Sequence, residues 1–96
     1  MLRHIVLLSF KDGVTREDRA AYRAAVDAFR DNPEVRALTL GENVGSGPNH
    51  HDFAVVIDFD DMASFRRYIA SPMHAEYVES FAKRMVARLA AVQHEF

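Results

Sequence analysis

The chain contains no cysteine among its 96 residues. Both a disulfide framework and a catalytic thiol are therefore excluded. Because disulfides are rare in reducing compartments, their absence fits a cytoplasmic protein, which is what we expect. The first residues, MLRHIVLLSFKDG, form only a short apolar run and lack a small-residue cleavage signal, so a secretory peptide is not predicted.

Long apolar runs and an excess of basic residues are missing as well. No segment approaches the ~20 apolar residues that a membrane-spanning helix needs. The formal net charge is −2, and the arginines are spread along the chain rather than gathered in a basic patch. We therefore predict neither a membrane nor a nucleic-acid partner.

Motifs for metal, phosphate or serine chemistry are not found. In the stretch NHHD, residues 49–52, neighbouring side chains of an extended chain point to opposite faces and cannot easily share an ion. The stretch GENVGSGP has glycines but lacks the lysine and the hydroxyl residue of a P-loop. No serine lies in a nucleophile-elbow context. We predict no metal site.

The residues that are present predict a single domain over residues 1–96. Hydrophobic residues make up 49% of the sequence and charged residues 27%, as in an ordinary globular protein. Four segments rich in β-branched and large apolar residues predict strands. They cover residues 3–10, 35–44, 52–59 and 90–96.

Helices are predicted between these strands. Thr15 is a suitable N-cap for the first, with acidic residues in its first turn. A short second helix follows the third strand. Ser71, with Pro72 at the first helical position, begins a last helix whose apolar stripe continues to Leu89. The resulting order is β-α-β-β-α-β, with the second helical region divided in two.

This order predicts an α+β fold of the ferredoxin-like type, an antiparallel four-stranded sheet with helices on one face. The first and third strands are apolar on both alternate sets of side chains. We expect the uncovered face to carry the set His4, Val6, Leu8, Phe53, Val55 and Ile57. Because an exposed apolar patch of that size marks an interaction surface, we predict a homodimer through the open sheet face.

Four stretches support a family assignment: HIVLLSFKDGVTRED, LGENV, DFAVVIDFDDMASFRRYIASPMHAEYV and the terminal pair Glu95-Phe96. In this order and spacing the chain resembles the stress-responsive dimeric α/β-barrel family, often called Dabb, over essentially its whole length. The resemblance implies a ferredoxin-like protomer whose sheets close into a dimeric α/β barrel. Within the family the chain is similar to plant olivetolic acid cyclase, which closes a linear polyketide by aldol condensation without a metal or organic cofactor.

The resemblance also implies roles for individual residues. The catalytic histidine of that cyclase corresponds to His74, and the tyrosine that assists it corresponds to Tyr68. The carboxylate that orients the catalytic histidine corresponds to Glu95, which is one methylene longer. A histidine of the first strand that lines the pocket corresponds to His4.

Two departures imply a different pocket. Phe53 replaces a second pocket histidine of the cyclase, and Val26 replaces an aromatic residue of its first helix. The pocket should therefore differ in shape and polarity, and we do not expect the same substrate. The ligand is expected to be small, largely hydrophobic and oxygenated. Its predicted binding residues are His4, Val6, Leu8, Val26, Phe53 and Val55.

The position of His74 can be interpreted in two ways. As the third residue of a helix it experiences a dipole that disfavours the imidazolium form. A neutral imidazole near pH 7 is what a general base requires, and Tyr68 could donate a hydrogen bond to a developing enolate oxygen. Alternatively, His74 hydrogen-bonds the C-terminal strand and only holds the helix in place.

Three functions follow from these interpretations. The first is a cofactor-independent cyclase or lyase that removes a proton next to a carbonyl group, with His74 as the base. The second is a non-catalytic domain that binds a ligand or serves the stress response by its own stability. The third is a cofactor-free monooxygenase, because related dimeric barrels host such chemistry.

Overall fold

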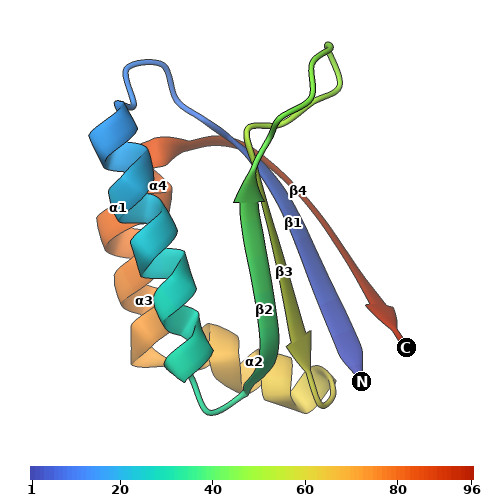
Figure 1. Cartoon of the computed structure of the whole chain (residues 1–96). Coiled ribbons are helices and arrows are strands. Elements are labelled where there is room, and N and C mark those ends of the chain that lie inside the picture. The colour runs from blue at the N-terminus through green and yellow to red at the C-terminus, as the bar shows by residue number, and fades with distance from the viewer.

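The computed structural model describes all residues, 1–96, and shows a four-stranded sheet with its helices on one side (Figure 1). Every neighbouring pair of strands is antiparallel. The spatial order is β2-β3-β1-β4. The strands are β1 Leu2–Phe10, β2 Val35–Glu42, β3 Phe53–Phe59 and β4 Val86–Glu95. The predicted ferredoxin-like β-α-β-β-α-β fold is confirmed.

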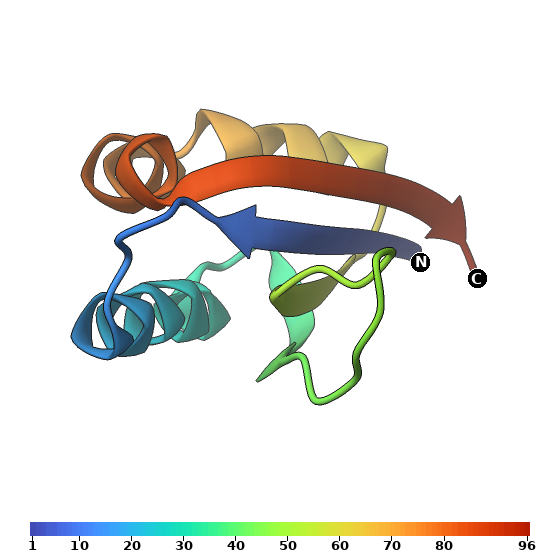
Figure 2. The same cartoon turned by 90° about the horizontal axis from the view of Figure 1, so that it is seen from above.

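The helices form one layer over the sheet. In both views α1 and the α3–α4 segment lie side by side over the same face (Figures 1 and 2). None of them is long and apolar enough to cross a lipid bilayer. Their bounds are α1 Arg16–Asp27, followed by a 3-10 turn at Ala28–Asp31, then α2 Met62–Ala70, α3 Pro72–Tyr77, a π-helical turn Val78–Ala82 and α4 Lys83–Met85.

The helix starts occur where the sequence predicts them. The hydroxyl of Thr15 accepts a hydrogen bond from the backbone N–H of Asp18 at 3.1 Å. The carboxylate of Asp18 accepts one from the backbone N–H of Thr15 at 3.0 Å, completing a capping box. Ser71 caps α3 by accepting from the backbone N–H of His74 at 3.3 Å, with Pro72 at the first helical position. These caps set the rotation at which α1 and α3 face the sheet.

The last helix ends at Met85 and does not continue to Leu89 as predicted. Leu89 instead lies in β4, opposite Leu8 of β1. The spacing from Met85 to Leu89 fits a helical turn, but it also fits a strand that places alternate residues on one face. The backbone groups of β1 need partners, and pairing with β4 from Val86 onward satisfies them.

The prediction of which side chains face away from the helices was wrong. The set His4, Val6, Leu8, Phe53, Val55 and Ile57 packs beneath the helices, where four of its members belong to the buried core. Strand alternation defines two sets of side chains, but it does not say which set lies under the helices. The set that contains the larger side chains fills the deep layer between sheet and helices. The open face carries Ile5, Leu7, Val56 and Val92 instead.

Candidate functional site

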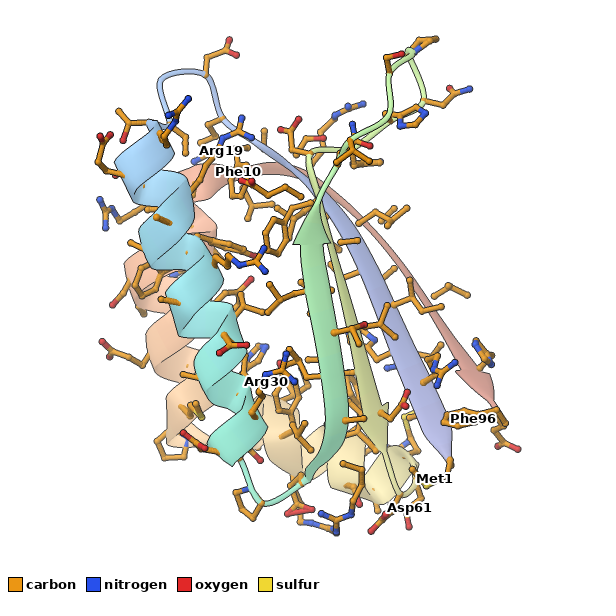
Figure 3. The ribbon with its side chains drawn as sticks, viewed as in Figure 1. Met1, Phe10, Arg19, Arg30, Asp61 and Phe96 are labelled. Atoms are coloured by element: carbon orange, nitrogen blue, oxygen red, sulfur yellow. The ribbon has the colours of Figure 1, made fainter.

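A cavity of about 230 Å³ lies between the sheet and the helices. Figure 3 shows the side chains of the two layers meeting in this space. Strands β1, β3 and β4 supply its floor, and α1, the 3-10 turn, α2, α3 and the π-helical turn supply its other walls. Local π-helical geometry is frequent at functional sites, and here Val78 and Ala82 of that turn reach the cavity.

Most of the residues predicted to bind a ligand lie at this cavity. They are His4, Val6, Leu8, Val26, Val55, Tyr68 and His74. Phe53 and Glu95 are not part of the lining. The residues come from both ends of the sequence, because the register of β1 against β3 and β4 brings them to one face of the sheet.

His74 projects from α3 into a cluster of aromatic rings. Its ring centre lies 5.1 Å from that of Tyr68 and 5.7 Å from that of Tyr77. Neither ring nitrogen makes a hydrogen bond within the protein, so the alternative role of fastening α3 to the C-terminal strand has no supporting contact. Burial lowers the pKa of His74 below its ordinary value. The imidazole is therefore neutral near pH 7, with its nitrogens available to a ligand.

His4 is the second histidine of the cavity. Its Nδ1 lies 3.1 Å from the amide nitrogen of Gln93, the residue opposite it on β4. In this orientation the amide donates to Nδ1, which leaves the ring proton on Nε2. Burial, followed by the nearby His74, lowers the pKa of His4. His4 is thus a neutral side chain that can donate a hydrogen bond through Nε2.

Tyr68 supplies an unused hydroxyl group. The residue is only 4% exposed, and its hydroxyl makes no hydrogen bond within the protein. Every fully buried side-chain oxygen or nitrogen in the structure has a partner, so this unpaired hydroxyl is not completely buried, and Tyr68 is one of the residues that line the cavity. Burial raises the pKa of Tyr68, which keeps the phenol protonated and able to donate.

The structure does not bring Glu95 to His74. Glu95 is exposed at the end of β4, opposite Leu2, and forms neither a hydrogen bond nor an ion pair with the histidine. Its role as the orienting carboxylate stays a prediction without a contact in the protomer. Gln93 lies two residues earlier on the same strand face and is the β4 side chain that does contact a cavity histidine. Sequence reasoning missed Gln93 because the contact depends on the register of β4.

Phe53 packs behind the residues that line the cavity. It is 2% exposed, and its ring meets that of Tyr22 edge-on at 5.7 Å and that of Phe10 at 6.2 Å. The ring fills the space beside Tyr22 rather than reaching the cavity itself. Phe53 therefore shapes the site indirectly, and its direct contact with a ligand stays a prediction.

Two tyrosines of the lining were missed as candidates. Tyr22 of α1 and Tyr77 of α3 both reach the cavity, and their hydroxyl oxygens lie 2.6 Å apart. Tyr22 belongs to the apolar stripe of its helix, so its position in the sequence did not distinguish it from ordinary core residues. Tyr77 follows His74 by three residues, a spacing that places two side chains on the same helix face. The spacing from His74 could therefore have identified Tyr77 as a candidate site residue.

The electrostatics of the cavity come from neutral groups. Two imidazoles and three phenols supply its side-chain polarity, and no carboxylate, lysine or arginine lines it. The chain contains no cluster of three or more histidine, aspartate or glutamate side chains arranged to hold a metal ion. Such a site suits an uncharged, mostly apolar ligand with oxygen atoms that accept hydrogen bonds.

The chain matches a known protein family over almost its whole length. The family model for the stress-responsive A/B barrel domain, Dabb, matches residues 2–95. The chain belongs to this family. An uncharacterised protein of Streptomyces coelicolor is 35% identical over 78 residues, which cover 77% of this chain and 79% of that protein. The resemblance to Dabb proteins expected from the sequence is therefore confirmed.

Solved structures of this Dabb protein's relatives share the fold closely. A dimeric ferredoxin-like protein of unknown function from Thermobifida fusca superposes with a TM-score of 0.87 at 31% identity, covering 99% of this chain and 90% of that one. The hydroxynitrile lyase of Passiflora edulis superposes with a TM-score of 0.86 at 18% identity, covering 97% and 90%. At that lower identity the likeness shows the common fold alone.

Proposed function

We propose that this Dabb protein binds a small, largely apolar carbonyl compound in the cavity and removes a proton from the carbon next to the carbonyl group. His74 is the general base and Tyr68 is the hydrogen-bond donor to the carbonyl oxygen. One observation carries the proposal: an unpaired neutral imidazole and an unpaired phenol lie side by side in an apolar cavity. No cofactor is required for this step.

The chemistry follows from the properties of these two groups. As the C–H bond breaks, its proton moves to a ring nitrogen of His74 and negative charge develops on the carbonyl oxygen. The Tyr68 hydroxyl stabilises that charge more strongly in a low-dielectric cavity than it would in water. The enolate carbon can then attack a second carbonyl group, and His74 returns its proton to the resulting alkoxide. The reverse sequence cleaves a carbon–carbon bond, so cyclase and lyase reactions are accessible to the same groups.

Packing against aromatic rings, rather than contact with a carboxylate, orients the imidazole of His74. The ring of His74 is enclosed by Phe29, Tyr68 and Tyr77, with centre-to-centre distances between 5.1 Å and 6.0 Å. The capped start of α3 fixes the backbone from which it projects. His4, with its proton on Nε2, would contribute a second donor to the ligand.

A homodimer through the open sheet face is part of the proposal. On that face Leu7 is 40% exposed and Val92 is 56% exposed, and Ile5 lies between Val56 of β3 and Val92 of β4 in the strand register. Apolar side chains in such a row favour a second copy of the same surface. The similar protein from Thermobifida fusca is described as dimeric, which supports this arrangement.

Exchange of ligand protons with solvent tests the proposed reaction. Acetophenone in D₂O should lose its α-protons faster with the protein than without it, as followed by ¹H NMR. His74→Ala should lower the enzymatic rate about 10²–10⁴-fold because the general base is gone. His50→Ala, in an exposed loop away from the cavity, should leave the rate unchanged and serves as the matched control.

The same experiment separates catalysis from simple binding. Full exchange activity in the His74→Ala protein would remove His74 from the mechanism. A wild-type protein that binds the ketone but never accelerates exchange would instead be a non-catalytic ligand-binding domain.

A further inference from the structure

The hydrogen-bonded pair Tyr22–Tyr77 lies at the cavity but has no part in the proposed reaction. Tyr22 comes from α1 and Tyr77 from α3, and their hydroxyl oxygens are 2.6 Å apart. Both residues belong to the cavity lining. No other side chain or backbone group of the protein hydrogen-bonds to either hydroxyl. The pair is therefore the last polar group of the cavity without an assigned role.

Counting donors shows that the pair is incompletely satisfied. Two neutral phenols have two O–H groups, and the single bond between them uses one, whichever tyrosine donates. Burial raises the pKa of Tyr22 and of Tyr77, so both remain protonated at neutral pH. One O–H group is left without a partner inside the protein. A buried donor in this state gains free energy when a ligand supplies an acceptor.

Tyr68 and Tyr77 both lie next to His74. The ring centre of His74 is 5.1 Å from that of Tyr68 and 5.7 Å from that of Tyr77. The ring of Phe29 contacts both tyrosines edge-on, at 5.2 Å and 5.3 Å, and separates them. Because Tyr22, Tyr68, His74 and Tyr77 share one cavity, a ligand whose carbonyl oxygen meets Tyr68 can also reach the pair.

We propose that the Tyr22–Tyr77 pair is a second binding point that selects ligands with a second oxygen acceptor, such as dicarbonyl compounds. The inference rests on the proposed function for the position of the first carbonyl group. The second oxygen must be uncharged, because the cavity offers no cation to a carboxylate. The cavity volume of about 230 Å³ is below the roughly 300–1,000 Å³ of pockets for drug-sized ligands, so the compound is small.

The binding role can be distinguished from a purely structural one. If its role were only structural, the pair would hold α1 against α3 equally well with any ligand or with none. As a binding point, it would raise affinity only for ligands that present a second acceptor. A matched pair of ligands, with and without that acceptor, therefore isolates the binding role.

Three aryl ketones serve as probes. Butyrophenone has one carbonyl group, whereas benzoylacetone and phenacylacetone each have two, at different separations. Binding to the wild-type protein, to the single variants Tyr22→Phe, Tyr77→Phe and Tyr68→Phe, and to the double variant Tyr22→Phe/Tyr77→Phe is measured by isothermal titration calorimetry. Each substitution keeps the aromatic ring and removes one hydroxyl, and thermal unfolding confirms that each variant is folded.

We expect at least one dione to bind the wild type about fivefold more tightly than butyrophenone, as one additional hydrogen bond would provide. The double variant Tyr22→Phe/Tyr77→Phe should abolish this preference and leave the affinity for butyrophenone unchanged, whereas each single variant still carries one unpaired O–H group and should keep a preference for diones. Tyr68→Phe should weaken all three ligands and keep the preference, because it removes the contact that the ligands share.

Several results would overturn the inference. These are equal affinity of the wild type for diones and butyrophenone, a preference for diones that survives undiminished in the double variant Tyr22→Phe/Tyr77→Phe, or no binding of either dione. Because binding is measured without turnover, the proposed reaction is judged separately. A wild-type protein that prefers diones but exchanges no α-protons would refute His74 catalysis and leave this binding point standing.

Discussion

The two faces of the sheet are both largely apolar, yet they differ in the kind of polar residue that interrupts them. The cavity on the helix-facing side contains His4 of the sheet and the tyrosines of the helices above it, all of which are uncharged in the folded protein, and Gln93 contacts His4 there. The open side carries Arg3, whose guanidinium donates to both carboxylate oxygens of Asp58 at 2.8 Å and 3.0 Å.

This difference reflects what each environment does to a charge. Under the helices a charge would lose its hydration, so the polar groups found there are ones that can be neutral at pH 7. On the open face Arg3 remains partly hydrated and also packs over the ring of Phe96, 4.3 Å from its centre. Figure 3 shows Phe96 beside Met1 at that end of the sheet. The type of polar residue, rather than apolar content, therefore distinguishes the cavity side of the sheet from its open face.

Truncating one large side chain on each face should give the largest difference. Phe59→Ala removes a ring that is 0% exposed beneath the helices and should lower the free energy of unfolding by about 3–5 kcal/mol. Val92→Ala on the open face should cost less than about 1 kcal/mol, because its side chain is already half exposed. Urea unfolding at equal protein concentrations measures both. Similar losses would mean that the two faces are equally buried in the protein in solution.

Placing a charge on the open face should affect assembly rather than folding. Leu7→Glu puts two like charges into a two-fold interface and should weaken dimerisation about a hundredfold, while the protomer stays folded. Analytical ultracentrifugation and circular dichroism follow the two properties. Ala24→Glu, on the exposed side of α1, is the control and should remain dimeric. A wild-type protein that is monomeric at micromolar concentration would contradict the interface.

The smallest expected effect is on the pH dependence of stability. Groups on the two faces of the sheet should contribute to it over different pH ranges. The pKa values of His4 and His74 are lowered from 6.5, so as the pH falls below 6.5 the unfolded chain binds protons that the folded one does not. Stability should therefore decline from pH 6.5 downward until the lowered values are passed. The pKa of Asp58 is lowered from 3.8, chiefly by its hydrogen bonds to Arg3, so its contribution is lost only below pH 3.8.

Urea unfolding across this pH range separates the two contributions. His74→Asn should flatten the upper part of the profile, and Asp58→Asn should flatten the lower part. A profile in which His74→Asn changes nothing above pH 5 would show that the ring is not desolvated.

Local sequence patterns predicted much of this structure. The capping residues Thr15 and Ser71, the succession of helices and strands along the chain and the position of His74 at the third residue of its helix are all as expected. Each depends on neighbours within a few residues, so the relevant energies are visible in the sequence. The location of His4, Tyr68 and His74 at one cavity followed from the family resemblance.

Features that depend on contacts between distant segments were not predictable in this way. The register of β4 against β1 decides that Gln93, rather than Glu95, contacts a cavity histidine. The Tyr22–Tyr77 contact requires the relative rotation of two helices that are far apart in sequence. No local pattern encodes either distance.

The sequence by itself determined the elements, their caps, their order and the family, because these follow from periodicity, local hydrogen bonding and a recognisable set of motifs. Only the tertiary structure decided which apolar face of the sheet lies beneath the helices. In a strand, two equally apolar sets of side chains alternate, and the choice between them is made by how well each fills the space under α1 and α3. That choice turned His4, Val6 and Val55 inward to form a cavity and left Leu7 and Val92 exposed on the open face.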